Sequence, residues 1–446
     1  MIVRVTLFAL CAIVIAAPAA GAAPARFQIV QPGITAAPRA SRDAADPLVP
    51  EEWWRADVHV DTLTPPGPGV PVSIVDSGVE FTHPEFVGRP DFTALNNQEP
   101  APIGGVHGTA VASVVGASVN GIGVVGIYPT AVMRSYDASL GDGTRLPAAD
   151  IAAGILTAAR AGRSVINLSL GSNQPDDLID GAIAEAVRLG SLVVAASGNS
   201  GQEGNPPSYP ADDPHVLTVA ATDESDQVAP FSSQSQSVDI AAPGVDIPVA
   251  TALDNSWALE DGTSFSSPLV AGAAAWLWTV RPDLDASQVA EILRESARDV
   301  GPPGFDTATG YGILDLTAAL AAPTPQADSA EPNDDIQSAA TVTTRSTPSG
   351  TTSGRVALYE DPRDVLRVWL PAKKRLTVTA TSAPGVALAL YQSSLTPVSR
   401  LASSTRTGAN TVLSFTNRGV GRAAFLVVTP ARGVRSSTYT ASLSTK

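Results

Sequence analysis

The feature that most constrains this fold is a regular exchange of short apolar segments and longer helical ones along the middle of the chain. The short segments are rich in valine, isoleucine and alanine, which is typical of buried strands. A helix between two strands of one sheet makes them parallel, because the chain must cross the sheet before the next strand begins. We therefore expect an α/β domain, with a mainly parallel sheet flanked by helices on both faces. The expected strands are 70–75, 164–170, 191–196, 216–221 and 238–241, and the expected helices are 178–189, 269–280 and 286–298.

Changes of composition divide the rest of the chain. Residues 1–22 combine Arg4, an apolar run and small residues at the end, which is the layout of a secretory signal peptide. Residues 23–50 are rich in alanine and proline and are expected to form a short, poorly ordered leader. The α/β domain then spans 51–322. Residues 323–330 contain two prolines and small polar residues, so they are expected to be a linker.

Beyond the linker, residues 331–446 alternate apolar and polar side chains with the period of a strand. Leu376, Val378 and Ala380, for example, alternate with threonines. Strands with one apolar face favour antiparallel sheets that bury that face. The sequence therefore predicts a small all-β sandwich domain at the end of the chain.

The charge and the cysteine content limit the partners and the compartment. The formal net charge is -15, which argues against nucleic acid as the partner. No segment after the signal is long and apolar enough to span a membrane. Cys11, the only cysteine, would leave with the signal, so the mature chain has no disulfide. We expect a secreted, extracellular monomer.

Three polar residues of the α/β domain stand where strands end or helices begin. Asp76 closes an apolar strand, and His107 opens a helix. Pro268 is expected in the first turn of a later helix, which places Ser264 at or just before its N-terminus. Taken alone, Asp76 is equally consistent with an aspartate of a turn, and Ser264 with an ordinary helix N-cap.

These residue types together are suited to nucleophilic catalysis by a serine. A hydroxyl is a poor nucleophile until a neutral imidazole takes its proton, and the imidazole needs a carboxylate that fixes its tautomer. Asn199 adds an amide that can donate a hydrogen bond to the oxyanion of a tetrahedral intermediate. The sequence thus offers the four groups that acyl transfer requires.

Four blocks around these residues resemble the motifs of subtilisin-like serine proteases. They read Val-Ser-Ile-Val-Asp76-Ser-Gly, His107-Gly-Thr-Ala-Val-Ala, Ser-Gly-Asn199-Ser-Gly and Gly-Thr-Ser264-Phe-Ser-Ser-Pro. The resemblance implies that Asp76 orients the imidazole, that His107 is the general base and acid, and that Ser264 is the nucleophile. It also implies that Asn199 lines the oxyanion hole.

A further match concerns substrate binding. Ser169, Leu170 and Gly171 resemble the segment that pairs with the substrate backbone as an added strand and forms one wall of the primary pocket. A plain strand end is the alternative for this segment. Ser200 stands where many relatives carry an acid, and no carboxylate is expected to replace it. The resemblance therefore implies a preference for apolar or neutral side chains over lysine and arginine.

Two departures from the family pattern stand out. Phe265 replaces a methionine that the family usually has, and a swap of one large apolar residue for another should preserve the packing. The leader 23–50 is too short to be the folded propeptide of many secreted relatives. We therefore expect folding without that propeptide, or help from the C-terminal domain or from another protein.

The tail resembles the bacterial pre-peptidase C-terminal domain, on the segment that begins at Glu331 and on the inner motif Asp361-Pro-Arg-Asp364. Glu331, Asn333 and Asp334 offer the oxygen ligands that calcium prefers, although an acidic linker end explains them equally well. The chemistry itself requires no cofactor, so any calcium would be structural.

The leading interpretation is a secreted serine endopeptidase that hydrolyses protein or peptide substrates through an acyl-enzyme. The alternative is a catalytically silent binding protein on the same scaffold. The full set of Asp76, His107, Ser264 and Asn199 favours the enzyme. An esterase of the α/β-hydrolase type would need a Gly-x-Ser-x-Gly block and the order Ser, Asp, His, which this chain lacks.

Overall fold

The computed structural model describes residues 26–28, 35–36, 46–98, 106–140, 145–252, 254–328, 333, 339–357, 361–395, 398–407 and 410–446. The chain divides into two compact units, Met1–Thr324 and Pro325–Lys446, each of which is described by itself. The expected signal at 1–22, with Cys11, lies outside the described residues, as does most of the leader 23–50.

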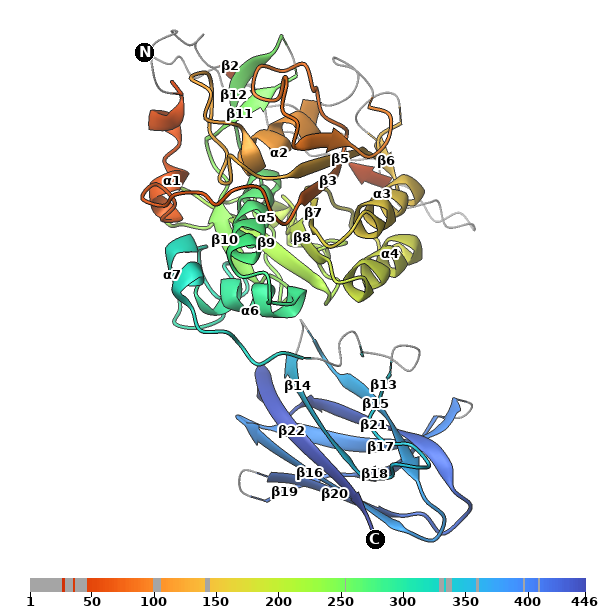
Figure 1. Cartoon of the computed structure of the whole chain (residues 1–446). Coiled ribbons are helices and arrows are strands. Elements are labelled where there is room, and N and C mark those ends of the chain that lie inside the picture. Colours follow the sequence, from red (N-terminus) through yellow and green to blue (C-terminus); the bar gives the residue numbers. More distant parts are fainter. Residues whose placement is uncertain are drawn as a thin grey trace. The chain divides into compact units, whose positions relative to one another are not determined.

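A seven-stranded sheet forms the centre of the first unit, and all of its neighbouring strands run parallel (Figure 1). Together with the helices on both faces, this confirms the expected α/β fold class. Later strands lie on both sides of β3, so the order of strands changes direction there. Open sheets often bind ligands at such a switch point. The strands, in spatial order, are β10 (Ile240–Pro243), β9 (Val216–Thr222), β8 (Leu192–Ala196), β7 (Val165–Leu168), β3 (Val72–Asp76), β5 (Met133–Asp137) and β4 (Phe92–Ala94).

Each central strand serves two apolar cores, one on each face of the sheet. In β8, Val194 belongs to the cluster that contains the helices α2 (Val106–Gly116) and α5 (Thr263–Val280). Its neighbour Val193 belongs to the cluster that contains α3 (Ala148–Arg160) and α4 (Asp177–Arg188). Successive side chains of a strand point to opposite faces, so an uninterrupted apolar run is what a sheet covered on both faces requires.

The start of α5 differs from the expectation. The helix begins at Thr263, so Ser264 is its second residue and Pro268 lies inside the helix rather than in its first turn. A proline there cannot donate the hydrogen bond from residue i to the carbonyl of residue i−4, which is Ser264. The carbonyl of Ser264 accepts instead from the hydroxyl of Ser169, at 2.8 Å. A contact between distant segments thus replaces the bond that the proline removes.

Other helices end or begin near their expected bounds. Helix α6 (Ala286–Glu295) stops before the expected residue 298, because Arg298 forms an antiparallel bridge with Ile313. The remaining helical segments of this unit are short. They are η1 (Val49–Glu51), α1 (Trp54–Asp57), η2 (Gly201–Glu203) and α7 (Leu316–Ala321).

Short antiparallel strands surround the main sheet and were not expected from the sequence. Strands β11 (Ile247–Thr251) and β12 (Ser256–Glu260) pair with each other. Two strands of the leader join other segments: β1 (Arg26–Gln28) pairs with β6 (Arg145–Pro147), and β2 (Thr35–Ala36) pairs with β12. The leader's own sequence lacks apolar periodicity, so its partners supply this order through backbone hydrogen bonds.

The second unit is all-β, as expected, with two five-stranded sheets whose apolar side chains form one shared cluster. Its paired strands run antiparallel except for β13 and β15. One sheet has the order β13 (Ala340–Thr341), β15 (Asp364–Leu370), β21 (Arg422–Pro430), β17 (Val386–Leu395) and β18 (Val398–Ser403). The other has the order β14 (Gly350–Ala357), β22 (Ser436–Thr445), β16 (Arg375–Ala383), β20 (Asn410–Thr416) and β19 (Thr405–Thr407).

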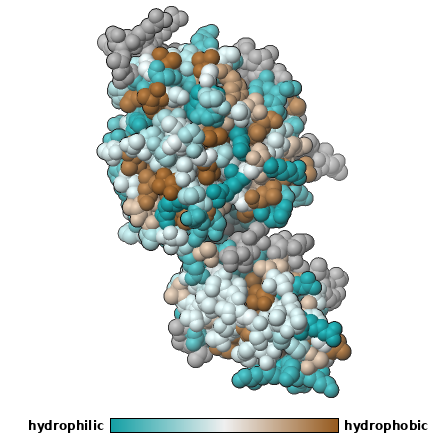
Figure 2. Space-filling model, in the orientation of Figure 1, coloured by the Kyte–Doolittle hydropathy of each residue, from teal (hydrophilic) through white to brown (hydrophobic). Residues whose placement is uncertain are grey.

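The surface is mixed in polarity. On the face drawn in Figure 2, hydrophobic residues are scattered among hydrophilic and neutral ones. Among the described residues, no helix combines the length and the apolar character needed to cross a bilayer.

Candidate active site

Asp76 and His107 meet at the carboxyl end of β3, an interior strand of the main sheet. Asp76 is the last residue of β3, and His107 is the second residue of α2. The imidazole Nδ1 lies 2.9 Å from Oδ1 of Asp76 and 3.0 Å from Oδ2. Both residues are buried, with 1% and 4% of their surface exposed. Because a carboxylate only accepts hydrogen bonds, this contact keeps the proton of a neutral imidazole on Nδ1 and leaves Nε2 as an acceptor.

The other nitrogen of His107 is free to take a proton. Among the described residues, Nε2 is buried and has no hydrogen-bond partner. The ring of Phe265 lies against the imidazole, with 6.0 Å between the ring centroids, so this residue packs beside the site. A buried nitrogen with a lone pair and no partner is the state that a general base requires before substrate binds.

Ser264 lies at the opening turn of α5 and is 6% exposed. Its hydroxyl is 3.5 Å from the carbonyl oxygen of Ser169, and no hydrogen bond joins it to His107 in the described part of the chain. The structure therefore brings Asp76 and His107 into direct contact but leaves the serine hydroxyl turned to another acceptor. Such hydrogen bonds are often long or misaligned until substrate binds.

The Ser169 segment holds the serine from the other side. The Ser169 hydroxyl donates to the Ser264 carbonyl, and the Ser169 carbonyl faces the Ser264 hydroxyl. Ser169 follows directly on β7, so the end of this strand fixes the first turn of α5. Leu170 and Gly171 continue the segment along the wall of a cavity.

Asn199 lines the same cavity. Its Oδ1 accepts hydrogen bonds from the backbone nitrogen of Thr263 at 3.0 Å and from the Thr263 hydroxyl at 2.8 Å. These two donors fix the orientation of the amide. Nδ2 has no hydrogen-bond partner within the described ranges, so it remains available to an acceptor.

The cavity encloses about 280 Å³ beside Ser264. It contains every sequence-predicted site residue except Asp76 and His107, which lie outside its lining. Its wall is formed mostly by small polar residues and prolines. The lining residues are Ser169, Leu170, Gly171, Ser172, Asn173, Ala196, Gly198, Asn199, Ser200, Glu203, Pro206, Pro207, Ser208, Ser233, Thr263 and Ser264.

One expectation about this cavity is wrong. The sequence suggested that no carboxylate replaces the acid missing at Ser200, but Glu203 lines the cavity and accepts a hydrogen bond from the Ser200 hydroxyl at 3.2 Å. The turn η2 folds back over three residues and brings the two side chains together. The signal in the sequence was the glutamate three residues after Ser200. It indicates a carboxylate beside Ser200 only when the intervening residues form a turn.

Sequence reasoning also missed Glu260, the last residue of β12. Burial raises the pKa of this carboxyl to about 7, and the charge of His107 opposes that rise. The side chain is 8% exposed and makes no hydrogen bond within the described residues. The charge of His107 thus keeps the pKa of Glu260 below the value that burial alone would give.

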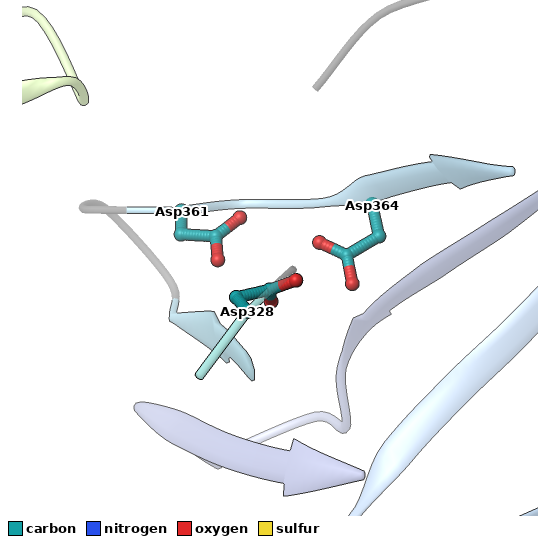
Figure 3. Close-up of side chains that lie close together, drawn as sticks. All are labelled: Asp328, Asp361 and Asp364. Atoms are coloured by element: carbon teal, nitrogen blue, oxygen red, sulfur yellow. The ribbon is translucent and has the colours of Figure 1, made fainter. Parts of the chain in front are cut away.

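The candidate calcium ligands of the second unit are arranged differently from the expectation. Glu331 and Asp334 lie outside the described residues, and the side-chain oxygen of Asn333 accepts from the backbone nitrogen of Val365. The carboxylates of Asp328, Asp361 and Asp364 instead come within 4.8 Å of one another (Figure 3). Asp328 and Asp364 each accept a hydrogen bond from a protein donor.

Those donors are the backbone nitrogen of Arg355, which reaches Asp328, and the hydroxyl of Tyr439, which reaches Asp364. Burial and the neighbouring carboxylates raise the pKa of Tyr439 above its ordinary value, so this hydroxyl stays protonated. Carboxylate oxygens are suitable calcium ligands, but donors already occupy part of this cluster. Calcium binding stays a prediction.

Comparisons with known proteins identify the family of this chain. A sequence profile of the subtilase family matches residues 67–312. Subtilisin BL from Lederbergia lenta is 36% identical over 253 residues, which cover 57% of this chain and 91% of that protein. The minor extracellular protease Epr of Bacillus subtilis (strain 168) is 29% identical over 292 residues, which cover 66% of this chain and 44% of that protein.

A solved structure supports the same assignment at the level of the fold. The subtilisin-like protease Apa1 from the Antarctic psychrotroph Pseudoalteromonas sp. AS-11 aligns with a TM-score of 0.54 at 20% identity. The alignment covers 60% of this chain and 97% of that one. The profile alone spans more than half of the chain, including the segments that carry Asp76, His107 and Asn199. The chain therefore belongs to the subtilase family of serine peptidases.

Proposed function

We propose that this protein is a secreted endopeptidase that hydrolyses peptide bonds in proteins and peptides through an acyl-enzyme on Ser264. The observation that carries the proposal is the contact of Asp76 with Nδ1 of His107, which leaves a buried Nε2 without a partner in the described residues. A general base acts by taking a proton from a neighbouring group, so a proton donor must lie within its reach. Ser264, on a helix of the same core, is the candidate.

The proposed reaction has two halves. In the first, the Ser264 hydroxyl oxygen bonds to the carbonyl carbon of the substrate while His107 Nε2 takes the hydroxyl proton. Nδ2 of Asn199 and the backbone N–H of Ser264 donate to the oxyanion that forms. The C–N bond then breaks, and the proton on Nε2 passes to the leaving amine.

In the second half, water attacks the ester on Ser264, and His107 takes a proton from this water. The ester bond to the Ser264 oxygen breaks as the tetrahedral intermediate collapses. The proton returns from Nε2 to the Ser264 oxygen, and the acid product leaves. No cofactor takes part in this chemistry, and any bound calcium would be structural.

Substrate is expected to bind beside the strand end at Ser169, Leu170 and Gly171, whose backbone would pair with an extended peptide. Secretion is supported by the signal-like layout of residues 1–22 and by a relative that is named as extracellular. We expect a monomer, since no partner is needed to complete the site that the described residues form.

The decisive experiment is covalent labelling of the purified protein with a fluorophosphonate probe. Wild type should be labelled, Ser264→Ala should not, and Ser172→Ala, which changes another serine of the cavity wall, should be labelled like wild type. The same three proteins should show the same order in hydrolysis of casein. A folded wild type that is neither labelled nor active would favour the alternative, a catalytically silent binding protein.

A further inference from the structure

The cavity beside Ser264 carries a single charge. Among its lining residues in the described part of the chain, Glu203 is the only one with an ionisable side chain. The remaining wall offers hydroxyls, backbone, two side-chain amides, prolines and the apolar side chains of Leu170 and Ala196. No lysine, arginine or histidine lines the cavity to neutralise the carboxylate.

A neighbouring hydroxyl orients the Glu203 carboxylate but leaves one of its two oxygens without a partner in the described residues. The Ser200 hydroxyl donates to Oε2, while Oε1 has no hydrogen bond or ion pair within the described residues. The turn that carries it is anchored, since the backbone nitrogen of Gly201 donates to the carbonyl of Phe231 at 2.8 Å. A β-carbon at Gly201 would lie 2.4 Å from the carbonyl oxygen of Ser232, so the turn packs tightly against that segment.

The position of Glu203 suits the end of a long side chain. Glu203 is exposed, so it stands on the solvent side of the cavity, whereas Ser264 is buried. Ala196 and the prolines 206–207 line the same cavity as Glu203, so its wall offers apolar surface as well as the carboxylate. Lysine and arginine have this pattern, with an apolar stem and a charged end that stays near water.

We propose that Glu203 makes this cavity accept lysine and arginine on the acyl side of the scissile bond. The inference rests on the proposed peptidase activity, and it replaces the neutral preference that the sequence suggested. An exposed pair of opposite charges contributes modestly, so the effect is a widened preference rather than an absolute requirement. It should weaken as salt screens the pair.

The test compares peptide substrates that differ only in the residue before the cleaved bond: lysine, arginine, leucine or glutamate. Glu203→Gln should lower kcat/KM for lysine and arginine by about 3- to 5-fold and leave leucine within about twofold. The Glu203→Lys variant should reverse the order, so that glutamate gains and lysine loses. The advantage of the basic substrates in wild type should shrink between low and high salt.

Two controls distinguish an effect of the Glu203 charge from an effect of a changed turn at 201–203. Glu224→Gln removes the same charge from an exposed site away from the cavity and should change nothing. Ser200→Ala removes the hydrogen bond to Glu203 but keeps the charge, so the basic substrates should keep their advantage. Equal losses on leucine and lysine in Glu203→Gln, or no response to either Glu203 variant, would overturn the inference.

Failure of this inference is distinguishable from failure of the proposed function. If wild type cleaves the leucine substrate and reacts with the fluorophosphonate but ignores Glu203, the peptidase stands and the specificity is wrong. If folded wild type neither cleaves any substrate nor reacts with the probe, the peptidase proposal itself fails.

Discussion

At the scale of single residues, the contact between Asp76 and His107 makes a sharp prediction. In Asp76→Asn the amide can donate to Nδ1 and so favour the tautomer with its proton on Nε2, which cannot accept from Ser264. We expect kcat on a peptide substrate to fall by about 10³- to 10⁴-fold, with the fold and the thermal midpoint nearly retained. Steady-state kinetics and fluorophosphonate labelling rates measure the loss. A variant with normal activity would exclude the proposed role of Asp76.

A second residue-scale prediction concerns Glu52, which is 3% exposed. Burial raises the pKa of its carboxyl to about 8, although the backbone nitrogen of Val125 and the charge of Arg55 act in the opposite direction. A raised pKa in the folded state means that the folded protein binds the proton more tightly than the unfolded chain. The stabilisation is complete below the unfolded pKa of 4.5 and is lost as the pH rises to about 8.

Glu52→Gln should therefore gain stability relative to wild type as the pH rises from 4.5 to 9. The difference should reach a few kcal/mol, since one pKa unit corresponds to about 1.4 kcal/mol. Urea unfolding at several pH values measures it. The neighbouring Glu51 is exposed, so Glu51→Gln is a matched control and should show no such trend. A constant difference between Glu52→Gln and wild type at all pH values would contradict this account.

At the scale of elements, the link between β7 and α5 can be tested by a double-mutant cycle. Ser169→Ala leaves the buried carbonyl of Ser264 without its donor, so we expect a loss of about 1–3 kcal/mol in the free energy of unfolding. Pro268→Ala restores a backbone N–H that can donate to the same carbonyl. In the double variant the loss caused by Ser169→Ala should become much smaller.

The measurement is urea unfolding of the four proteins of this cycle. Ser172→Ala is a suitable control, because its hydroxyl only accepts from the backbone nitrogen of Gln174 at an exposed position. Additive effects of the two changes would mean that the Ser169 hydroxyl does not substitute for the bond that the proline removes.

The same elements show which parts of the fold could be predicted from the sequence. The apolar runs predicted five of the seven strands of the main sheet, and α4, to within a few residues, because strands covered on both faces are apolar throughout. Strands β4 and β5 of the same sheet and helix α3 were not predicted. The predicted start of α5 was wrong. The prediction used only the preference of proline for the first turn of a helix, whereas the donor to the Ser264 carbonyl comes from Ser169, which is distant in the sequence. The leader strands and β11 were missed for a similar reason, since their order depends on the strands beside them.

The candidate site divides in the same way. Asp76, His107, Asn199 and Ser264 could be proposed as site residues, because their types suit acyl transfer and the blocks around them resemble family motifs. Glu203 and Glu260 could not, since an acid in a loop or at a strand end is common. Only the folded turn at 201–203 and the end of β12 bring these two carboxylates to the site.

At the scale of the whole molecule, the two units have separate apolar cores. The clusters of the first unit and that of the second share no residue. We therefore expect residues 325–446, produced alone, to fold and to unfold in one cooperative urea transition. Circular dichroism should show strands, and the buried Tyr439 should be protected from nitration until that transition. A chain that lacks any cooperative transition would show that the second unit depends on the first.

The two cores of the first unit have a consequence for how long such a molecule survives. A peptidase works among copies of itself, and a copy is cut only where its chain opens enough to enter another's site. Because β8 and its neighbours supply alternate side chains to both faces, we expect the two faces to open together rather than one at a time. We therefore expect such shared strands to limit self-digestion in a chain whose one cysteine, Cys11, lies in the expected signal.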